Sequence, residues 1–436
     1  MVKKTANIDW LGKIYIGLLL VVFGGIVLHA PFSVGFTSFF PDYELLIKSW
    51  KEILLGVATL VLLGLLTIHN RWNIFKQPLF LLIAAFAVLN IALVPLYFTG
   101  IESTLAGILV NLRYLLFFVL VYAALILYPQ YSRLFIKVFI GGALVVLVFA
   151  ILQLTVLPND FLKYLGYNSS TIMPYLTVDQ NDSFIRINST LRGPNPLGAY
   201  AMVVLVLLLA FWLKAPREIT KREQVFMGIL GVGGVVALWA SYSRSAVLGI
   251  VIAIGLVLFS TVRRKIGKTV WVILAIAVLA VGGSLIALKD TDFVSNVILH
   301  EDPSEGNSVN SNDGHAESLI DGTNRVVAQP LGGGIGSTGS ASLMTDSPLI
   351  IENQYLFIAH ETGWLGLGLF VAISWLLLSK LWRGRKDWFV LGVFAGGVAL
   401  ALIGLIQPVW VDETVAIIWW GLAAIALRRT RTKEYL

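Results

Sequence analysis

Long apolar runs constrain this chain more than any other feature of its sequence. Twelve of them are long enough to cross a lipid bilayer as helices. They fall at about residues 14–29, 45–68, 78–98, 104–127, 134–157, 196–213, 225–241, 246–262, 269–288, 354–379, 388–406 and 412–427. Only 13% of the 436 residues are charged, whereas about one-quarter are charged in a soluble domain. The sequence therefore predicts an all-α, polytopic integral membrane protein that forms a single membrane domain over residues 1–436.

The distribution of basic residues predicts how the chain is oriented in the membrane. With the N-terminus in the cytoplasm, the segments on the inner side hold 23 of the 32 lysines and arginines and only 5 of the 25 acidic residues. The positive-inside rule favours this orientation over the reverse. It predicts that both termini are cytoplasmic and that two long loops, about 158–195 and 289–353, lie outside. The net charge of +7 then follows from topology and does not indicate binding to nucleic acid.

Several classes of function are disfavoured by what the sequence lacks. It has no cysteine, which excludes disulfides, thiolate zinc sites and a cysteine nucleophile. It has no GxxxxGK[ST] motif, and Gly332–Gly336 (GGGIG) is not followed by a lysine, so we expect no phosphate-binding P-loop. The inner loops are too short for a nucleotide-binding domain. The stretch Ser304–Gly314 is rich in Asn, Ser and Gly and is predicted to be flexible.

A polar stretch, Arg186 to Tyr200 (RINSTLRGPNPLGAY), leads directly into an apolar run. Pro194 and Pro196 lack a backbone N–H, so we expect an irregular strap that ends by starting a helix near Pro196. Arg192 would then lie at the mouth of that helix, on the same side of the membrane as Arg244. Two neighbouring guanidinium groups repel each other unless an anion with two negative charges lies between them. A diphosphate has that charge, and the planar fork of arginine matches it.

Arg244 itself lies in a serine-rich turn (SYSRSAVLG) between two apolar runs. The structural alternative for this residue is an arginine that snorkels to the membrane surface and anchors the turn. Ser241, Ser243 and Ser245 surround it, so the turn is rich in hydrogen-bond donors. That composition favours a binding role.

Further polar residues lie within or beside apolar runs. Arg113 in the fourth run is either a substrate contact or the structural partner of a carboxylate or of carbonyl groups. Glu352 and Asn353 open the tenth run. Glu352 is a candidate general base, or a carboxylate that stabilises a helix start. His360, which lies beside Glu361 about two turns deeper, is the second candidate for the base, or a neutral histidine bonded within the bundle. Asn353 shares a helix face with His360 and is a candidate substrate contact, as is Arg113.

Two acidic pairs have a spacing that can hold a divalent metal ion. They are Asp42 with Glu44 and Asp290 with Asp292. Such spacings are common by chance, and we predict no metal site and no cofactor.

Three stretches of the chain resemble the O-antigen ligase and polymerase superfamily of bacterial envelopes. They are LRGPNPLGAY before a run, SYSRSAVLG between two runs, and AQPLGGGIGSTG leading to ENQYLFIAHETGWLGLGLF, over about residues 186–370. The resemblance implies a GT-C-like glycosyltransferase architecture in the bacterial cytoplasmic membrane. It also implies an inverting, metal-independent transfer of a glycan from a polyprenyl diphosphate donor to a hydroxyl of a glycan or glycolipid acceptor. The family's diphosphate-binding arginines correspond to Arg192 and Arg244. Glu352 stands where the family usually has its catalytic histidine.

A flippase of lipid-linked glycans is the main alternative, because it also needs arginines for the diphosphate. A transporter should place its ionisable groups near mid-membrane, in discontinuous paired helices. Most candidate residues here cluster instead at the outer mouth, which favours a transferase. Within the family we favour a polymerase, since the altered histidine motif gives no specific reason to expect a lipid A-type acceptor.

The predicted orientation can be tested in this cysteine-free chain. Single cysteines introduced at Ser169 and Ser308, one in each long loop, should react from outside the cell with a membrane-impermeant thiol reagent. Labelling of either position only after the membrane is permeabilised would contradict the orientation.

Overall fold

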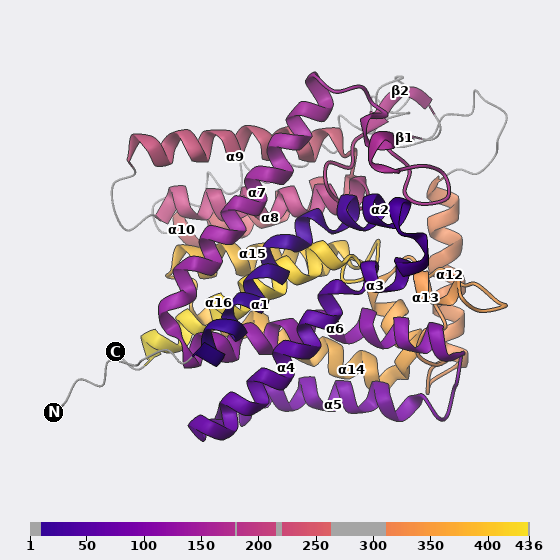
Figure 1. Ribbon diagram of the computed structural model, residues 1–436, viewed down its shortest axis with the longest axis horizontal. Coiled ribbons are helices and arrows are strands. Elements are labelled where there is room, and N and C mark those ends of the chain that lie inside the picture. Colours follow the sequence, from indigo (N-terminus) through magenta and orange to yellow (C-terminus); the bar gives the residue numbers. More distant parts are fainter. Residues whose placement is uncertain (1–9, 179–180, 215–219, 263–310, 435–436) are drawn as a thin grey trace.

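The protein is described here by a computed structural model that covers residues 10–178, 181–214, 220–262 and 311–434 (Figure 1). Its helices are α1 (Trp10–Gly25), α2 (His29–Phe39), α3 (Glu44–Lys48), α4 (Trp50–His69), α5 (Pro78–Leu93), α6 (Ile101–Leu127), α7 (Ser132–Thr155), α8 (Pro194–Lys214), α9 (Lys221–Ala240), α10 (Arg244–Val262), α12 (Ser311–Ala328), α13 (Gly339–Ser342), α14 (Gln354–Arg383), α15 (Trp388–Ile403) and α16 (Glu413–Glu434). Short 3₁₀ turns are η1 (Ile26–Leu28), η2 (Pro41–Tyr43), η3 (Trp72–Phe75), η4 (Pro129–Tyr131) and η5 (Phe161–Leu165), and the strands are β1 (Leu176–Val178) and β2 (Asn181–Arg186).

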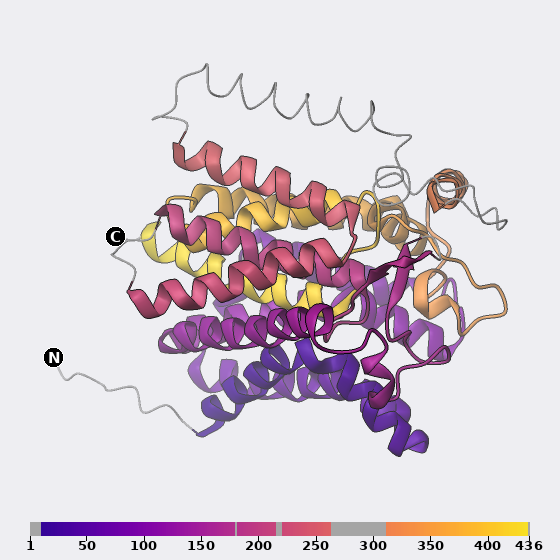
Figure 2. The same ribbon diagram turned by 90° about the horizontal axis from the view of Figure 1, so that it is seen from above.

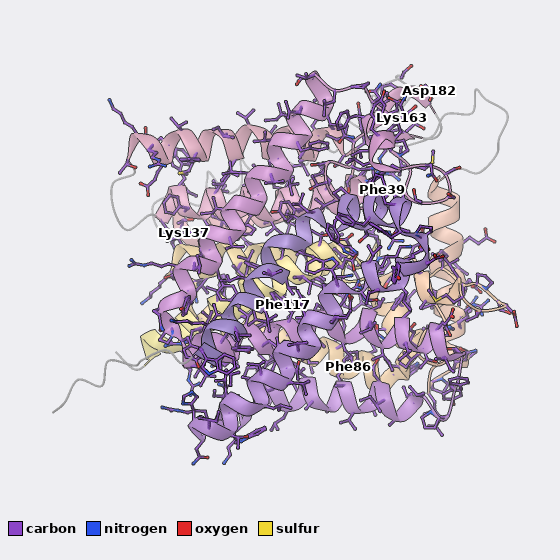
Figure 3. The ribbon with its side chains drawn as sticks, viewed as in Figure 1. Phe39, Phe86, Phe117, Lys137, Lys163 and Asp182 are labelled. Atoms are coloured by element: carbon purple, nitrogen blue, oxygen red, sulfur yellow. The ribbon has the colours of Figure 1, made fainter. Side chains whose placement is uncertain are left out.

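Most of the long helices lie side by side in one bundle (Figures 1 and 2). α1 begins and α16 ends at the same end of this bundle, which we call the terminal end. β1, β2, α12 and α13 lie at the opposite end, which we call the loop end. Figure 3 shows Lys137 near the terminal end and Lys163 and Asp182 at the loop end.

Among the described residues, eight helices are long and apolar enough to span a membrane, which confirms the all-α polytopic class. They are Trp10–Phe39, Trp50–His69, Ile101–Leu127, Pro129–Thr155, Pro194–Lys214, Lys221–Ala240, Arg244–Thr261 and Gln354–Arg383. Two more of the expected runs form the shorter apolar helices α5 and α15, of 16 residues each. The run at 412–427 forms α16. The expected run at 269–288 lies outside the described residues, as does the acidic pair Asp290 and Asp292.

The last helix, α16, is the centre of the bundle. Every residue from Thr414 to Leu427 is buried, as the uniformly apolar sequence VAIIWWGLAAIAL requires. α6, α8 and α15 pack around it. Gly421 gives the aromatic rings of Phe23 and Phe117 room, since a Cβ there would lie 2.7 and 2.8 Å from their ring atoms. Among the described helices, α16 therefore has the longest unbroken buried stretch.

The loop end departs from the sequence predictions in two places. Residues Leu176–Val178 and Asn181–Arg186 form an antiparallel hairpin with the pairs Leu176 to Arg186 and Thr177 to Ile185, whereas we expected no strand. The segment Ser304–Gly314 was expected to be flexible, but Ser311–Gly314 begins the 18-residue helix α12. α12 runs across the end of the bundle rather than along it (Figures 1 and 2). The rest of that segment lies outside the described residues.

The tenth expected span is not one continuous helix. Gly363 interrupts α14 with φ 67° and ψ −174°, and a Cβ there would lie 2.5 Å from the carbonyl oxygen of Pro330. Trp364 N–H donates to that same oxygen at 3.0 Å. The rings of Tyr355 and Phe370 lie 6.1 Å apart, although fifteen residues of straight helix would separate them by about 22 Å. The segment before Gly363 therefore folds back against the segment after it.

A glycine-rich loop, Gly332–Gly339, fills the space beside this break. Positive φ angles occur at four of its glycines, Gly332, Gly334, Gly336 and Gly339. Residues with a Cβ atom rarely adopt such angles. Gly336 lies against α6, because a Cβ on Gly107 would be only 2.4 Å from the Gly336 nitrogen. The glycines thus serve close backbone packing.

Basic side chains tie the helices together at the terminal end. Lys214 of α8 donates to the Arg385 carbonyl oxygen at 2.8 Å, and Arg429 of α16 pairs with Asp387 at 3.3 Å. Arg431 donates to the hydroxyl oxygen of Tyr122 of α6 at 3.3 Å. By the positive-inside rule this end is predicted to face the cytoplasm.

The contact between α6 and the glycine-rich loop gives a stability prediction. In Gly107→Ala the new methyl group meets the Gly336 backbone at 2.4 Å, and overpacking of this kind costs about 1–3 kcal/mol. We expect a lower midpoint of thermal unfolding in detergent. Gly64→Ala in α4 is the matched control, because no heavy atom lies within 4 Å of its Cβ position. Equal unfolding midpoints for the two variants would contradict the packing described here.

Candidate functional site

The polar strap before α8 is joined to the serine-rich turn before α10. Ile187 N–H donates to the Ala240 carbonyl oxygen at 3.1 Å. Arg186 donates through Nε to the Ser241 carbonyl oxygen at 3.0 Å and through Nη2 to Asn195 Oδ1 at 2.7 Å. Arg186 therefore connects the strap to the serine-rich turn before α10 and to the start of α8. Sequence reasoning did not assign it a role, although it is the first residue of the motif-bearing stretch.

This connection brings the predicted diphosphate-binding arginines to neighbouring helix starts. Arg192 lies two residues before α8, which begins at Pro194 rather than near Pro196, and Arg244 is the first residue of α10. The two starts are in contact, because a Cβ on Gly198 would lie 2.7–2.9 Å from side-chain atoms of Ser241, Ser243 and Ala246. Arg192 is exposed and Arg244 is half-buried.

The contacting starts of α8 and α10 form a region of positive electrostatic potential, which favours an anion. The N-terminus of a helix carries a partial positive charge and unpaired backbone N–H groups. Here two such termini, those of α8 and α10, lie together and each brings an arginine. The arrangement can bind a group with more than one negative charge, such as a diphosphate or a sulfate.

The loop between α15 and α16, Gly404–Asp412, runs between the start of α14 and the region of Arg192. The Gly404 carbonyl oxygen accepts from Gln354 N–H at 2.8 Å, and the Trp410 N–H donates to Gln354 Oε1 at 2.8 Å. At its other end, the Asp412 carboxylate interacts electrostatically with Arg192 and Arg113. Sequence reasoning missed this loop. The only signal for it was the adjacent pair Asp412 and Glu413 at the start of an apolar run.

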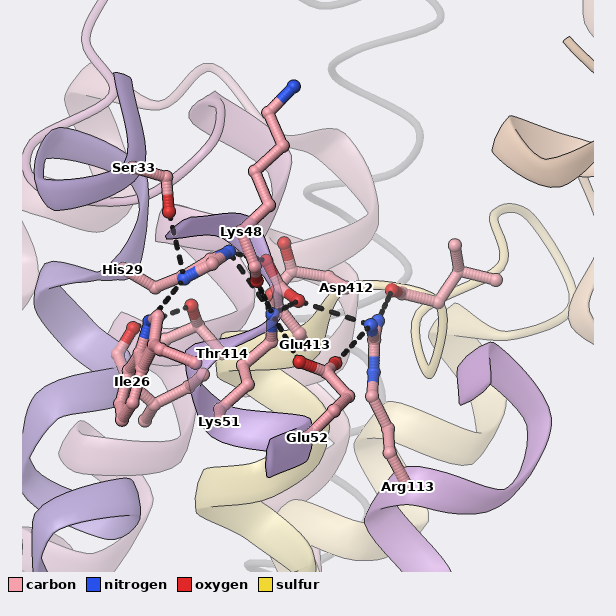
Figure 4. Close-up of polar contacts among 12 residues, drawn as sticks. Ile26, His29, Ser33, Lys48, Lys51, Glu52, Arg113, Asp412, Glu413 and Thr414 are labelled. Carbon is pink, nitrogen blue, oxygen red and sulfur yellow. Dashed lines mark hydrogen bonds and ion pairs between the residues drawn. The ribbon is translucent and has the colours of Figure 1, made fainter. Parts of the chain in front are cut away.

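Arg113 lies in a cluster of buried charges with Lys51, Glu52 and Glu413 (Figure 4). Its Nη1 is 3.1 Å from Glu413 and 3.6 Å from Glu52, and its Nη2 donates to the Val411 carbonyl oxygen at 2.7 Å. Lys51 lies 2.8 Å from Glu413. These contacts match the structural alternative for Arg113. Its role in substrate binding stays a prediction.

Glu352 and Asn353 lie at the start of α14, as the sequence predicts. Asn353 caps the helix: its Oδ1 accepts from the N–H groups of Tyr355 and Leu356, and its Nδ2 donates to the Leu405 carbonyl oxygen at 2.8 Å. Each end of its amide thus has a structural partner. Glu352 is half-buried, and its N–H donates to Ser318 Oγ of α12 at 3.2 Å. The candidate base therefore lies where α12 meets α14.

His360 and Glu361 lie in the folded-back segment of α14 and have different surroundings. Glu361 is fully buried and accepts from Asn111 Nδ2 at 2.6 Å and from Gly336 N–H at 2.9 Å. It thus anchors the glycine-rich loop to α6. His360 is 3% exposed, and its Nδ1 has no hydrogen-bond partner among the described residues. Its carbonyl oxygen accepts from Gly333 N–H at 2.6 Å.

The acidic pair Asp42 and Glu44 does not gather further ligands. Both side chains are exposed, and Glu44 pairs with Lys48 one turn along α3. Within the described ranges, no group of three or more His, Cys, Asp or Glu side chains could hold a metal ion.

The fold defines a polytopic membrane protein in which two arginine-bearing helix starts meet at the loop end. Residues 229–371 match the family model described as O-antigen ligase, which supports membership of the O-antigen ligase and polymerase superfamily and indicates a glycan-transferring enzyme. The match confirms the resemblance stated from the sequence. It includes Arg244, Glu352 and His360 and leaves out Arg192 and Arg113. No curated protein matches the chain.

Proposed function

We propose that this protein is a membrane glycosyltransferase of the bacterial cytoplasmic membrane. It transfers an oligo- or polysaccharide from a polyprenyl diphosphate donor to a hydroxyl of a glycan or glycolipid acceptor, on the outer face of the membrane. The reaction inverts the configuration at the sugar carbon and uses no metal ion. Of the two activities in the family, we favour polymerisation over ligation to a lipid A-type acceptor.

The observation that carries this proposal is the juxtaposition of Arg192 and Arg244 at two contacting helix starts. A leaving diphosphate gains negative charge as the glycosidic bond breaks. Fixed positive charge at that point stabilises the transition state more than the ground state, and this is usually the largest single contribution to catalysis. Nucleotides are absent outside the cytoplasm, so the donor must arrive already activated. A lipid-linked diphosphate satisfies that requirement.

The acceptor hydroxyl needs a base, and Glu352 is our first candidate. It accepts the hydroxyl proton while the acceptor oxygen attacks the sugar carbon from the side opposite the diphosphate. One C–O bond forms, the C–O bond to the diphosphate breaks, and the diphosphate leaves with the bonding electrons. His360 is the second candidate.

A flippase of lipid-linked glycans is the alternative function, and one observation favours it. α14 is discontinuous at Gly363, and broken helices line the substrate sites of many transporters. Purified protein given a polyprenyl diphosphate-linked glycan and an acceptor, without nucleotide, separates the two functions. A transferase lengthens the acceptor in detergent, whereas a flippase leaves all glycans unchanged.

The diphosphate site predicts a strong effect of conservative arginine substitutions. Arg192→Lys and Arg244→Lys keep the charge but lose the planar fork. Each lost charge-assisted hydrogen bond is worth about 1.5–3 kcal/mol, so transfer should fall roughly ten- to over a hundred-fold. Arg222→Lys, at an exposed position of α9, is the matched control and should retain wild-type transfer rates. Near-normal activity of both Arg192→Ala and Arg244→Ala would rule out the site.

The identity of the base can be decided with isosteric substitutions. Glu352→Gln keeps the side-chain shape and removes proton acceptance, so turnover should fall about 10²–10⁴-fold while donor binding survives. Glu352→His should retain some activity, since imidazole accepts protons near neutral pH. Glu317→Gln on the exposed face of α12 is the control. An inactive His360→Gln beside an active Glu352→Gln would transfer the role of base to His360.

A further inference from the structure

The buried ion cluster around Glu413 has no role in the transfer chemistry proposed above. It consists of His29 (α2), Lys51 and Glu52 (α4), Arg113 (α6) and Glu413 (α16) (Figure 4). The five side chains are between 4% and 15% exposed. Burying this many charges at the end of a membrane bundle is costly unless they compensate one another.

The charges in the cluster balance. Trp50 Nε1–H donates to His29 Nδ1 at 2.9 Å, and an indole N–H can only donate, so Nδ1 is an acceptor. The proton of the neutral ring is then on Nε2, which lies 2.6 Å from Glu413 Oε1. Two cations, Lys51 and Arg113, face two anions, Glu52 and Glu413. With a neutral His29 the cluster has no net charge.

The cluster holds the α15–α16 loop on both sides of Asp412. Arg113 binds the Val411 carbonyl oxygen and Glu413, the neighbours of Asp412 on either side. The Asp412 carboxylate lies within electrostatic range of Arg192 in the strap, without a direct ion pair among the described contacts. The other end of the loop is bonded to Gln354 and Asn353, next to Glu352. The same loop therefore sets the separation between the arginine site and the candidate base.

We propose that Arg113 and Glu413 are positioning residues, which fix the α15–α16 loop so that the diphosphate site and the base face one acceptor hydroxyl, and that Arg113 does not touch the donor. This inference rests on the function proposed above. Its chemical basis is that both Nη atoms of Arg113 already have partners within the protein. A misplacement of about 1 Å by a substitution remote from the reacting atoms can slow a reaction about 10²-fold.

Donor binding distinguishes a positioning arginine from a ligand. The probe is farnesyl diphosphate, whose dissociation constant is measured on purified protein in detergent. Arg113→Lys keeps the cluster neutral but replaces the two separate Nη contacts, to Glu413 and to the Val411 carbonyl oxygen, by a single nitrogen atom. We expect the dissociation constant to stay within about threefold of wild type while turnover falls about tenfold or more. Arg192→Lys should instead weaken binding about tenfold or more.

A charge-balanced double variant provides the second test. Arg113→Met or Glu413→Gln alone leaves unpaired charge in the cluster, whereas the two together leave it neutral. We expect the double variant to unfold at a higher temperature than either single variant, because its charges balance, while its turnover stays about tenfold or more below wild type, because neither contact that fixes the loop is restored. Glu413→Gln should not rescue Arg192→Met. The exposed pair Lys48 and Glu44 is the matched control, and Lys48→Met with Glu44→Gln should change neither quantity.

The outcomes separate this inference from the proposed function. Weaker farnesyl diphosphate binding in Arg113→Lys, equal to that in Arg192→Lys, would make Arg113 a ligand and overturn the inference. Wild-type turnover in Arg113→Lys and in Glu413→Gln would also overturn it. Unchanged binding and transfer in Arg192→Lys would instead remove the diphosphate site and with it the proposed function.

Discussion

The carboxylate of Glu413 is the buried charge on which the loop end depends. It opens the helix that lies at the centre of the bundle, and a buried anion is stable there only when cations and hydrogen bonds surround it. Arg113, Lys51 and His29 supply them from three other helices. Each helix is thereby fixed against the start of α16. The α15–α16 loop ends directly before Glu413, so its end is fixed by the same contacts.

A second buried carboxylate, that of Glu361, organises the other half of the loop end by a different means. Its partners are neutral: the Asn111 amide and the backbone N–H of Gly336. Such bonds need close backbone approach, and the glycines at 336 and 107 permit it. The GGGIG sequence is thus explained by close packing, because a Cβ on Gly332, Gly334 or Gly336 would meet the backbone of Glu361, Tyr97 or Ser103, respectively. The break of α14 at Gly363 belongs to the same arrangement, because Pro330 occupies the space that a side chain would need.

The charged groups at the loop end consequently divide into two kinds. Arg113 is largely buried and paired with carboxylates. Arg192 is exposed just before a helix start, and of the acidic residues near the cluster it acts on Asp412. A helix start with an arginine attracts anions, and a paired arginine holds protein segments in place. This division is the physical ground for assigning donor binding to one arginine and positioning to the other.

The sequence by itself determined the all-α membrane class, because uniformly apolar runs have few stable structures in a bilayer. It also determined that Arg192 and Arg244 stand at helix starts, since Pro194 and the SYSRSA turn are local signals. Only the tertiary structure decided that Arg113 pairs with Glu413, 300 residues further along the chain. It alone decided that α14 folds back at Gly363 and that Ser311–Gly314 is helical. These features depend on contacts between segments that are distant in the sequence, and local sequence patterns do not predict such contacts.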